Sequence, residues 1–308
     1  MRRSRASTGV SEHVVLCRPE GGFNDILCQI ELCWRYADAH ERVLVVDTAV
    51  TTFGDEFENY FRVAGGSRAE LRLTAERLRQ LNSASTLPEA VRGRLDAYEK
   101  TWSDAHRSYV DTRTGQVLRF DPTRRHPEAC LLHHQHGGGT VSLDALRRLR
   151  LQPWLSRHIR SRIGALGDDY DAIHVRNTDY VTDVDRFFAG LAGTFNGRRL
   201  LVCSDDAKVI DLARATFRRA EVVTVTEVPD LGGRPIHHHA EESGLPKRDI
   251  NRDMLTDLFA LASASRLYIS RVMDGPGGRL PYRQLSGFSY LAGGLKADPV
   301  LLRSLQSD

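Results

Sequence analysis

Lysine is scarce in this sequence of 308 residues, and almost all of its positive charge comes from arginine. The lysines are Lys100, Lys208, Lys247 and Lys296. The net charge of +3 is a small excess, so nucleic-acid binding through bulk electrostatic attraction gains little support. Because a guanidinium presents a planar fork of donors that suits phosphate, individually placed arginines remain candidates for anion binding.

Long apolar runs and cysteine pairs are also missing. No stretch approaches the roughly 20 apolar residues of a membrane span. The basic start, residues 1–5, is followed by no apolar segment of a secretion signal, so we expect neither a membrane span nor secretion. The five cysteines form no Cys-x-x-Cys pair, and four lie in apolar stretches, which is typical of a reduced, cytoplasmic protein.

Short apolar strands alternate with amphipathic helices, which predicts an α/β fold. His13–Cys17 is β-rich, Phe23–Ala37 has helical spacing, and Arg42–Asp47 is a continuously apolar strand. The alternation returns after the polar break Gly164–Asp169, where we place a boundary between two domains, residues 1–165 and 166–308. The expected later elements are strands at 171–175, 199–203, 221–225 and 266–270, and helices at 186–191, 206–217, 253–264 and 288–295.

Residues 48–150 show weaker periodicity. We predict short helices at 53–63, 69–81 and 87–104, a hairpin at 109–120, and helix from 143 to 163. Two histidine clusters lie in this chain, at His133–His136 and His237–His239. Neither has a carboxylate or cysteine at a familiar ligand spacing, so we predict polar surface loops rather than metal sites.

The stretch Asp171–Asp179 reads as a buried strand that ends in a polar turn. Ligands of open α/β sheets bind outside the carboxyl ends of parallel strands, so Arg176 is placed for an anionic ligand. The alternative is a structural pair of Arg176 with Asp179. The turn Gly21-Gly22 poses a similar choice, because its backbone amides could face an anion or an acceptor sugar, or the glycines could only relieve steric crowding.

Four separated segments resemble one family, the GDP-fucose-dependent fucosyltransferases of the α1,6 type, which include rhizobial nodulation enzymes. His174-Val-Arg176-Asn-Thr178-Asp179 resembles the family's HxRxTD segment, and Gly21-Gly-Phe-Asn-Asp25 resembles its first glycine turn. The other two are Val202-Cys-Ser204-Asp205-Asp206 and the pair of Asp253–Ala262 with Ser286-Gly-Phe-Ser289. Order and spacing agree from about residue 13 to residue 295.

The resemblance implies a GT-B-like architecture, in which two Rossmann-type domains face each other across a cleft. The first would bind the acceptor and the second the nucleotide sugar. It also implies inverting, metal-independent transfer of fucose from GDP-fucose to a bacterial glycan or glycolipid. The implied donor-binding residues are Gly21, Gly22, His174, Arg176, Asp205, Asp206, Asp257, Ser286 and Ser289.

Within that set, the resemblance implies that Arg176 holds the β-phosphate and that His174 and Asp257 fix the guanosine. Asp205 and Asp206 would lie at the nucleotide end, and Ser286 would bond phosphate or sugar. An arginine with hydroxyl and backbone donors can stabilise a pyrophosphate leaving group without a metal.

This chain departs from the family segment after Arg176. Asn177 and Tyr180 stand where the family commonly has a second basic residue and a lysine, and the later acidic position falls on Val184. An acceptor hydroxyl needs a base within hydrogen-bond reach, and the catalytic candidates beside Arg176 are Asp179, Asp183 and Asp185.

Several functions therefore stay open. The chain could use another nucleotide sugar on the same fold, or it could be a catalytically silent protein that binds a glycan or nucleotide. Asn24, Asp25, Trp102 and Tyr109 are candidates for contact with the acceptor, although Asn24 and Asp25 could simply cap the helix that begins there. We expect no nucleic-acid partner, and peripheral membrane contact through a lipid-linked acceptor stays open.

Overall fold

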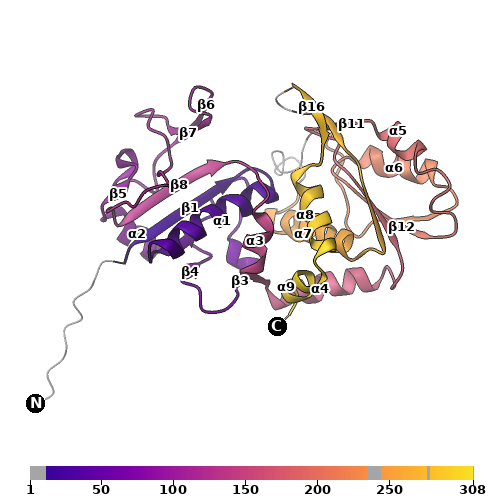
Figure 1. Cartoon of the computed structure of the whole chain (residues 1–308), viewed down its shortest axis with the longest axis horizontal. Helices are drawn as coiled ribbons and strands as arrows, with labels where there is room; N and C mark the ends of the chain where they lie inside the picture. The colour runs from indigo at the N-terminus through magenta and orange to yellow at the C-terminus, as the bar shows by residue number, and fades with distance from the viewer. Residues whose placement is uncertain (1–11, 233, 235–243, 276–277, 308) are drawn as a thin grey trace, which may run out of the picture.

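The computed structural model describes residues 12–232, 234, 244–275 and 278–307, so His237–His239 lie outside the described residues. Two parallel sheets form the two halves of the molecule, and helices α7 (Lys247–Ser263) and α8 (Gly287–Ala297) lie between them (Figure 1). The α/β class expected from the alternating pattern is confirmed.

The first sheet is built around β1 (Val14–Glu20), which pairs in parallel with a strand on each side. Its order is β4 (Ala69–Glu70), β2 (Val43–Val46), β1, β8 (Cys130–His136) and β5 (Thr86–Leu87). Helix α1 (Phe23–Ala39) buries Ile26, Leu27 and Ile30 against it. Each such fully buried side chain stabilises the fold by about 1.5–3 kcal/mol. The first four residues of β1, residues 14–17, are apolar without alternation because apolar clusters cover both faces of the sheet.

The region between β2 and β8 differs from the sequence-based prediction. It contains β3 (Phe61–Val63), α2 (Ala75–Asn82), a hairpin of β6 (Lys100–Ser103) and β7 (Ser108–Asp111), and 3₁₀ turns at Phe57–Asn59 and Glu89–Val91. The helix predicted at 87–104 is wrong: the 3₁₀ turn Glu89–Val91 is followed by Gly93 at φ +72°, outside the helical region. The apolar spacing that predicted helix at 53–63 comes from aromatic packing, with the rings of Phe57 and Phe61 4.7 Å apart.

The second sheet has the order β13 (Glu221–Val223), β12 (Arg199–Ser204), β10 (Asp171–Val175) and β14 (Arg266–Ile269), and its strands are parallel. Alternate residues of β10 face opposite layers. Ile173 and Val175 pack in a cluster with residues of α5 (Val184–Ala189) and α6 (Ala207–Thr216). Ala172 packs with α7. Because both faces are covered, the strand is buried throughout.

The end of the chain returns to the first half. After α3 (Ser142–Arg147), β9 (Leu149–Leu151) and α4 (Pro153–Gly164), the chain builds the second half and then α8 and α9 (Pro299–Leu305). The side chains of Arg62 and Ser156 donate to the carbonyls of Ser307 and Gln306, at 2.8 and 2.9 Å. One apolar cluster contains residues from β1, α7 and α9. The two sheets therefore share a continuous core.

A small antiparallel sheet of β11 (Val181–Thr182), β15 (Val272–Gly275) and β16 (Gly278–Gln284) rises from the second half. The β6–β7 hairpin rises from the first half on the same side of the molecule (Figure 1). Among the described residues, no helix combines the length and apolar character that crossing a membrane requires.

Candidate functional site

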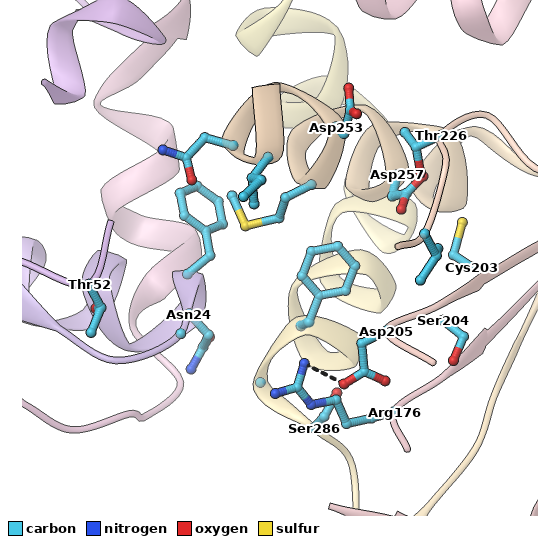
Figure 2. Close-up of a pocket in the computed structure, with 18 of the residues that line it drawn as sticks. Asn24, Thr52, Arg176, Cys203, Ser204, Asp205, Thr226, Asp253, Asp257 and Ser286 are labelled. Carbon is cyan, nitrogen blue, oxygen red and sulfur yellow. Dashed lines mark hydrogen bonds and ion pairs between the residues drawn. The ribbon is translucent and has the colours of Figure 1, made fainter. Parts of the chain in front are cut away.

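A cavity of about 370 Å³ lies where the two halves meet. The first half contributes the β1–α1 turn and residues after β2, and the second half contributes the ends of β10, β12 and β13 with α7 and the start of α8. In Figure 2, Asn24 and Thr52 face the same space as Arg176, Asp205 and Asp257. Residues expected from the sequence that line this cavity are Gly21, Gly22, Asn24, Asp25, His174, Arg176, Asp179, Asp205, Asp257 and Ser286.

Arg176 follows directly after β10 and is held by two carboxylates. Its Nε donates to Asp179 Oδ1 at 2.8 Å, and its Nη1 lies 2.8 Å from Asp205 Oδ2. Nη2 also contacts Asp179, at 2.5 Å. A guanidinium has five N–H groups, so Nη1 and Nη2 each keep a second one. The structural pair with Asp179 is thus present, and Arg176 also lines the cavity.

Asp205 holds in place both the side chain of Arg176 and the turn after β10. Its Oδ1 accepts the backbone N–H of Asn177 at 2.8 Å, and its Oδ2 accepts the hydroxyl of Thr178. The Asn177 side chain donates to Asp206 Oδ2 at 3.1 Å and accepts the backbone N–H of Thr182 at 3.2 Å. Asn177 therefore has a structural role where the resembling family commonly has a basic residue.

His174 is a residue of β10, and its side chain packs against the start of α8. Its Nδ1 is 2.8 Å from Ser289 Oγ, and its ring centroid is 5.1 Å from that of Phe288. Burial, together with the charge of Arg176, lowers the pKa of His174 to about 3. His174 is therefore neutral at physiological pH. Ser286 caps α8 by accepting the N–H of Ser289 at 3.1 Å, so the positive end of that helix faces the cavity.

Asp257 of α7 lies at the far end of the cavity, where it accepts the hydroxyl of Thr226 at 2.9 Å. Its carboxyl has some surface inside the cavity but is surrounded by protein. Loss of hydration, with a smaller contribution from Asp253 on the preceding turn, raises its pKa to about 7 against the hydrogen bond from Thr226. In its ionised form, a deep carboxylate offers two acceptor oxygens to a planar edge of adjacent N–H donors.

The glycine turn does not offer free amides to an anion. The N–H of Gly21 donates to Thr52 Oγ1 at 3.0 Å, and that of Gly22 donates to Asp25 Oδ2 at 3.2 Å. Gly21 adopts φ +101°, and a Cβ there would lie 2.9 Å from Asp25. The steric explanation therefore holds for Gly21 but not for Gly22, where a Cβ would lie 3.8 Å from Asp25 Oδ2. Both amides donate within the protein, and their donation to an anion or an acceptor sugar stays a prediction.

Asp25 and Asn24 were both expected either to cap α1 or to contact the acceptor, and their contacts in the structure differ. Asp25 caps α1 through Gly22. Asn24 instead accepts from Ser142 Oγ at 2.7 Å and donates to the carbonyl of Gly139 at 3.3 Å. Both also line the cavity, so capping and acceptor contact are compatible for Asp25.

Four expected site residues do not line the cavity: Asp183, Asp185, Asp206 and Ser289. Asp183 caps α5 by accepting the N–H of Arg186 at 3.2 Å, and Asp185 is an exposed residue of that helix. Neither is placed to take a proton from an acceptor, so they are removed from the catalytic candidates. Asp206 caps α6, and Ser289 contacts His174 and orients its ring. Both residues therefore support the wall of the cavity without lining it.

The loop predicted at His133–His136 is wrong, because these residues extend β8. His133 Nε2 lies 2.6 Å from Gln29 Oε1, and His134 Nε2 lies 3.0 Å from Glu20 Oε1. Burial lowers the pKa of His134 to about 4. Although burial opposes it, contacts with His134 and Lys100 lower the pKa of Glu20 to about 2. This buried network beside the cavity was missed, since its members are far apart in sequence.

Other lining residues were also missed, among them Thr226, Lys247 and Phe288. Lys247 Nζ donates to the carbonyl of Thr52 at 2.8 Å and so joins the two halves. Thr226 follows β13, and its position after a strand was the one signal that could have identified it. Among the described residues, no three His, Cys, Asp or Glu side chains come together in a way that could hold a metal ion.

No protein-family model matches the sequence, and no curated protein matches it. Solved structures do. The fucosyltransferase NodZ from Bradyrhizobium superposes with a TM-score of 0.58 at 19% identity, over 92% of each chain. NodZ α-1,6-fucosyltransferase co-crystallised with GDP gives 0.57 at 18% identity, also over 92% of each chain. The apo form of POFUT1 gives 0.52 at 13% identity, over 93% of this chain and 95% of that one. The chain therefore has the GT-B fold of these fucosyltransferases.

Proposed function

We propose that this protein is an inverting, metal-independent glycosyltransferase that transfers fucose from GDP-fucose to a glycan or glycolipid acceptor. One observation carries the proposal. Arg176, the start of α8 and the deep carboxyl of Asp257 line one cavity together with Asn24 and Asp25 of the first half, and Asn24 lies next to Gly287 at the start of α8. This arrangement offers separate places for a pyrophosphate, a guanine base and an acceptor.

Arg176 and α8 would stabilise the leaving group. As the bond between the sugar and the β-phosphate breaks, negative charge collects on the phosphate oxygen. The second N–H groups of Nη1 and Nη2 and the positive helix end at Ser286 can interact with that charge. Asp179 and Asp205 hold the guanidinium in place, which reduces the ordering required on binding.

The guanine base would lie against Asp257. Guanine presents its N1–H and amino group as adjacent donors, and a carboxylate accepts both. Uracil offers only one such N–H on the corresponding edge. We therefore expect preference for guanine nucleotides over uridine nucleotides. Residues 166–308 are our predicted donor-binding part and residues 1–165 our predicted acceptor-binding part.

A catalytically silent binding protein is the second candidate. The observation that favours it is the charge of the cavity. Its described lining has two cationic side chains, Arg176 and Lys247. The acidic ones are Asp25, Asp179, Asp205, Glu227, Asp253 and Asp257. Such a lining would weaken pyrophosphate binding unless the ion pairs of Arg176 rearrange. A same-fold transferase that uses another nucleotide sugar is the third candidate.

Calorimetry with GDP, GDP-fucose and UDP separates these candidates. We expect heat with both guanine nucleotides and little with UDP. Transfer of labelled fucose is then measured with chitin oligosaccharides, core glycans and lipid-linked saccharides. No binding of any guanine nucleotide would reject the leading proposal. Binding without hydrolysis or transfer would favour the silent protein, and tighter binding of UDP would favour another donor.

A further inference from the structure

The acidic residues that line the cavity differ in their partners. Asp179 and Asp205 pair with Arg176, and Asp253 lies 2.8 Å from Arg252 Nε. Asp257 lies deep beside Thr226 and Cys203, at the position that we propose for the guanine base of the donor. Two lining carboxyl groups remain, those of Asp25 and Glu227. Glu227 is an exposed residue that directly follows Thr226, so we assign it to the part of the cavity proposed for the nucleoside of the donor.

Asp25 comes from the opposite half. Within the part of the chain that the structure describes, no ion pair involves it, and its hydrogen-bond partners are the N–H of Gly22 and the neighbouring side chain of Asn24. The backbone of Gly138 passes close by, and a Cβ there would lie 2.4 Å from Asp25 Oδ1. The absence of a side chain at Gly138 is therefore needed for this carboxyl to occupy its position.

We propose that Asp25 is the general base of the transfer reaction, an inference that rests on the function proposed above. The acceptor hydroxyl oxygen forms a bond to the anomeric carbon while the bond from that carbon to the β-phosphate oxygen breaks. The electron pair of the broken bond stays with GDP. The hydroxyl proton moves to a carboxylate oxygen of Asp25, which later releases it to water.

The surroundings of Asp25 suit this task. Burial raises its pKa above the ordinary value, against the hydrogen bond from Gly22 and the charge of His136 on β8. A carboxylate with a higher pKa is a stronger base, as long as it stays ionised at the working pH. Among the described residues, Asp25 also raises the pKa of Cys28, on the same helix, and that of Tyr180, from the turn after β10, although burial is the largest cause for both. Tyr180 lines the cavity together with Asp25, Asp179 and Arg176.

The test compares Asp25→Asn with wild type. An asparagine oxygen can still accept the N–H of Gly22, so the helix start is kept while the base is lost. GDP release from GDP-fucose is measured with water alone and with a chitin oligosaccharide, from pH 5 to pH 9. We expect kcat to fall by about 10²–10⁴-fold, while the Kd for GDP and the melting temperature change little. At saturating GDP-fucose, where the pH dependence of donor binding does not enter, the acid limb of the wild-type kcat profile should disappear.

Asp298→Asn is the control for the loss of a carboxylate at a helix start, because Asp298 is the N-cap residue of α9, accepts the N–H of Leu301 at 3.0 Å and does not line the cavity. It should behave like wild type, and Asp25→Glu should recover part of the lost rate. Wild-type turnover by Asp25→Asn, or a loss of rate matched by lost GDP binding and stability, would overturn the role of Asp25 alone. A wild-type protein that neither binds GDP nor releases it from GDP-fucose would overturn the proposed function and this role with it.

Discussion

Arg176 is the residue on which donor binding most depends. Arg176→Ala should raise the Kd for GDP about 10- to 150-fold, because a charge-assisted donor to phosphate contributes about 1.5–3 kcal/mol. Arg176→Lys should restore only part of the affinity, since an ammonium cannot bridge two acceptors as the guanidinium bridges Asp179 and Asp205. Calorimetry on folded protein measures the change.

The purely structural role of Arg176 predicts another result. Removing it leaves Asp179 and Asp205 facing each other without a cation, so the melting temperature should fall in either case. If Arg176→Ala binds GDP as tightly as wild type per folded molecule, the phosphate role is wrong.

Asp257 should make donor binding depend on pH. Only its ionised form accepts two hydrogen bonds from guanine, and burial raises its pKa to about 7. Affinity for GDP-fucose should therefore fall by about tenfold for each pH unit below 7. GDP-fucose is the better probe, because GDP carries a terminal phosphate that itself ionises near pH ~6. His174 does not contribute in this range, since its pKa is lowered to about 3.

Asp257→Asn should bind guanine nucleotides weakly and without this pH dependence. Unfolding gives an independent check. The folded pKa of Asp257 lies above its unfolded value of about 3.9, so its contribution to stability is present below pH ~4 and is lost as the pH rises through 7. Between pH 5 and pH 8, the free energy of unfolding measured by chemical denaturation should fall less for Asp257→Asn than for wild type. Equal pH dependence in both proteins would show that Asp257 is not the titrating group.

At the scale of elements, the β6–β7 hairpin presents an aromatic group beside the cavity. The ring of Trp102 lies 4.4 Å from that of His136 and 5.5 Å from that of Tyr109. Trp102 remains 40% exposed. His136 precedes the glycines that pass next to Asp25, so an acceptor chain that reaches Asp25 can extend over this hairpin.

Trp102→Ala should raise the acceptor KM about 2- to 10-fold, since aromatic contacts of this kind contribute about 0.5–1.5 kcal/mol. The Kd for GDP should not change. Val300→Ala on α9 is the control, because Val300 is 69% exposed and lies on a helix outside the cavity. Steady-state kinetics with chitin oligosaccharides of increasing length measure both parameters. An acceptor KM equal to that of wild type at every length would exclude contact with Trp102.

At the scale of the whole molecule, the cavity joins two halves that share one core. A ligand bound there contacts only the folded protein, so GDP at 100 times its Kd should add about 2.7 kcal/mol to the free energy of unfolding. Because Arg176 and α8 supply the positive charge in our proposal, this stabilisation and fucose transfer should both persist in excess EDTA. Loss of both on chelation, with recovery on adding Mn²⁺ or Mg²⁺, would contradict the metal-independent mechanism.

Local sequence pattern was sufficient for the elements whose faces are both covered. The strands β1, β10 and β12 each contain consecutive apolar residues that do not alternate with polar ones, because both faces of their sheets are covered. The same pattern located Arg176 and Asp205 at strand ends. It failed between β2 and β8, where short elements depend on aromatic packing and on turns at Pro88 and Gly93.

Tertiary structure alone decided which of the polar residues face the cavity. Glu20 and His134 are 114 positions apart and meet only because β1 and β8 pair in parallel. Asp25 meets Gly138 for the same reason, whereas Asp183 and Asp185 remain on the outside of α5 although they lie close to Arg176 in sequence. The position of a residue along a strand or helix determines the face from which its side chain points. The packing of segments that are distant in sequence determines which of these faces borders the cavity.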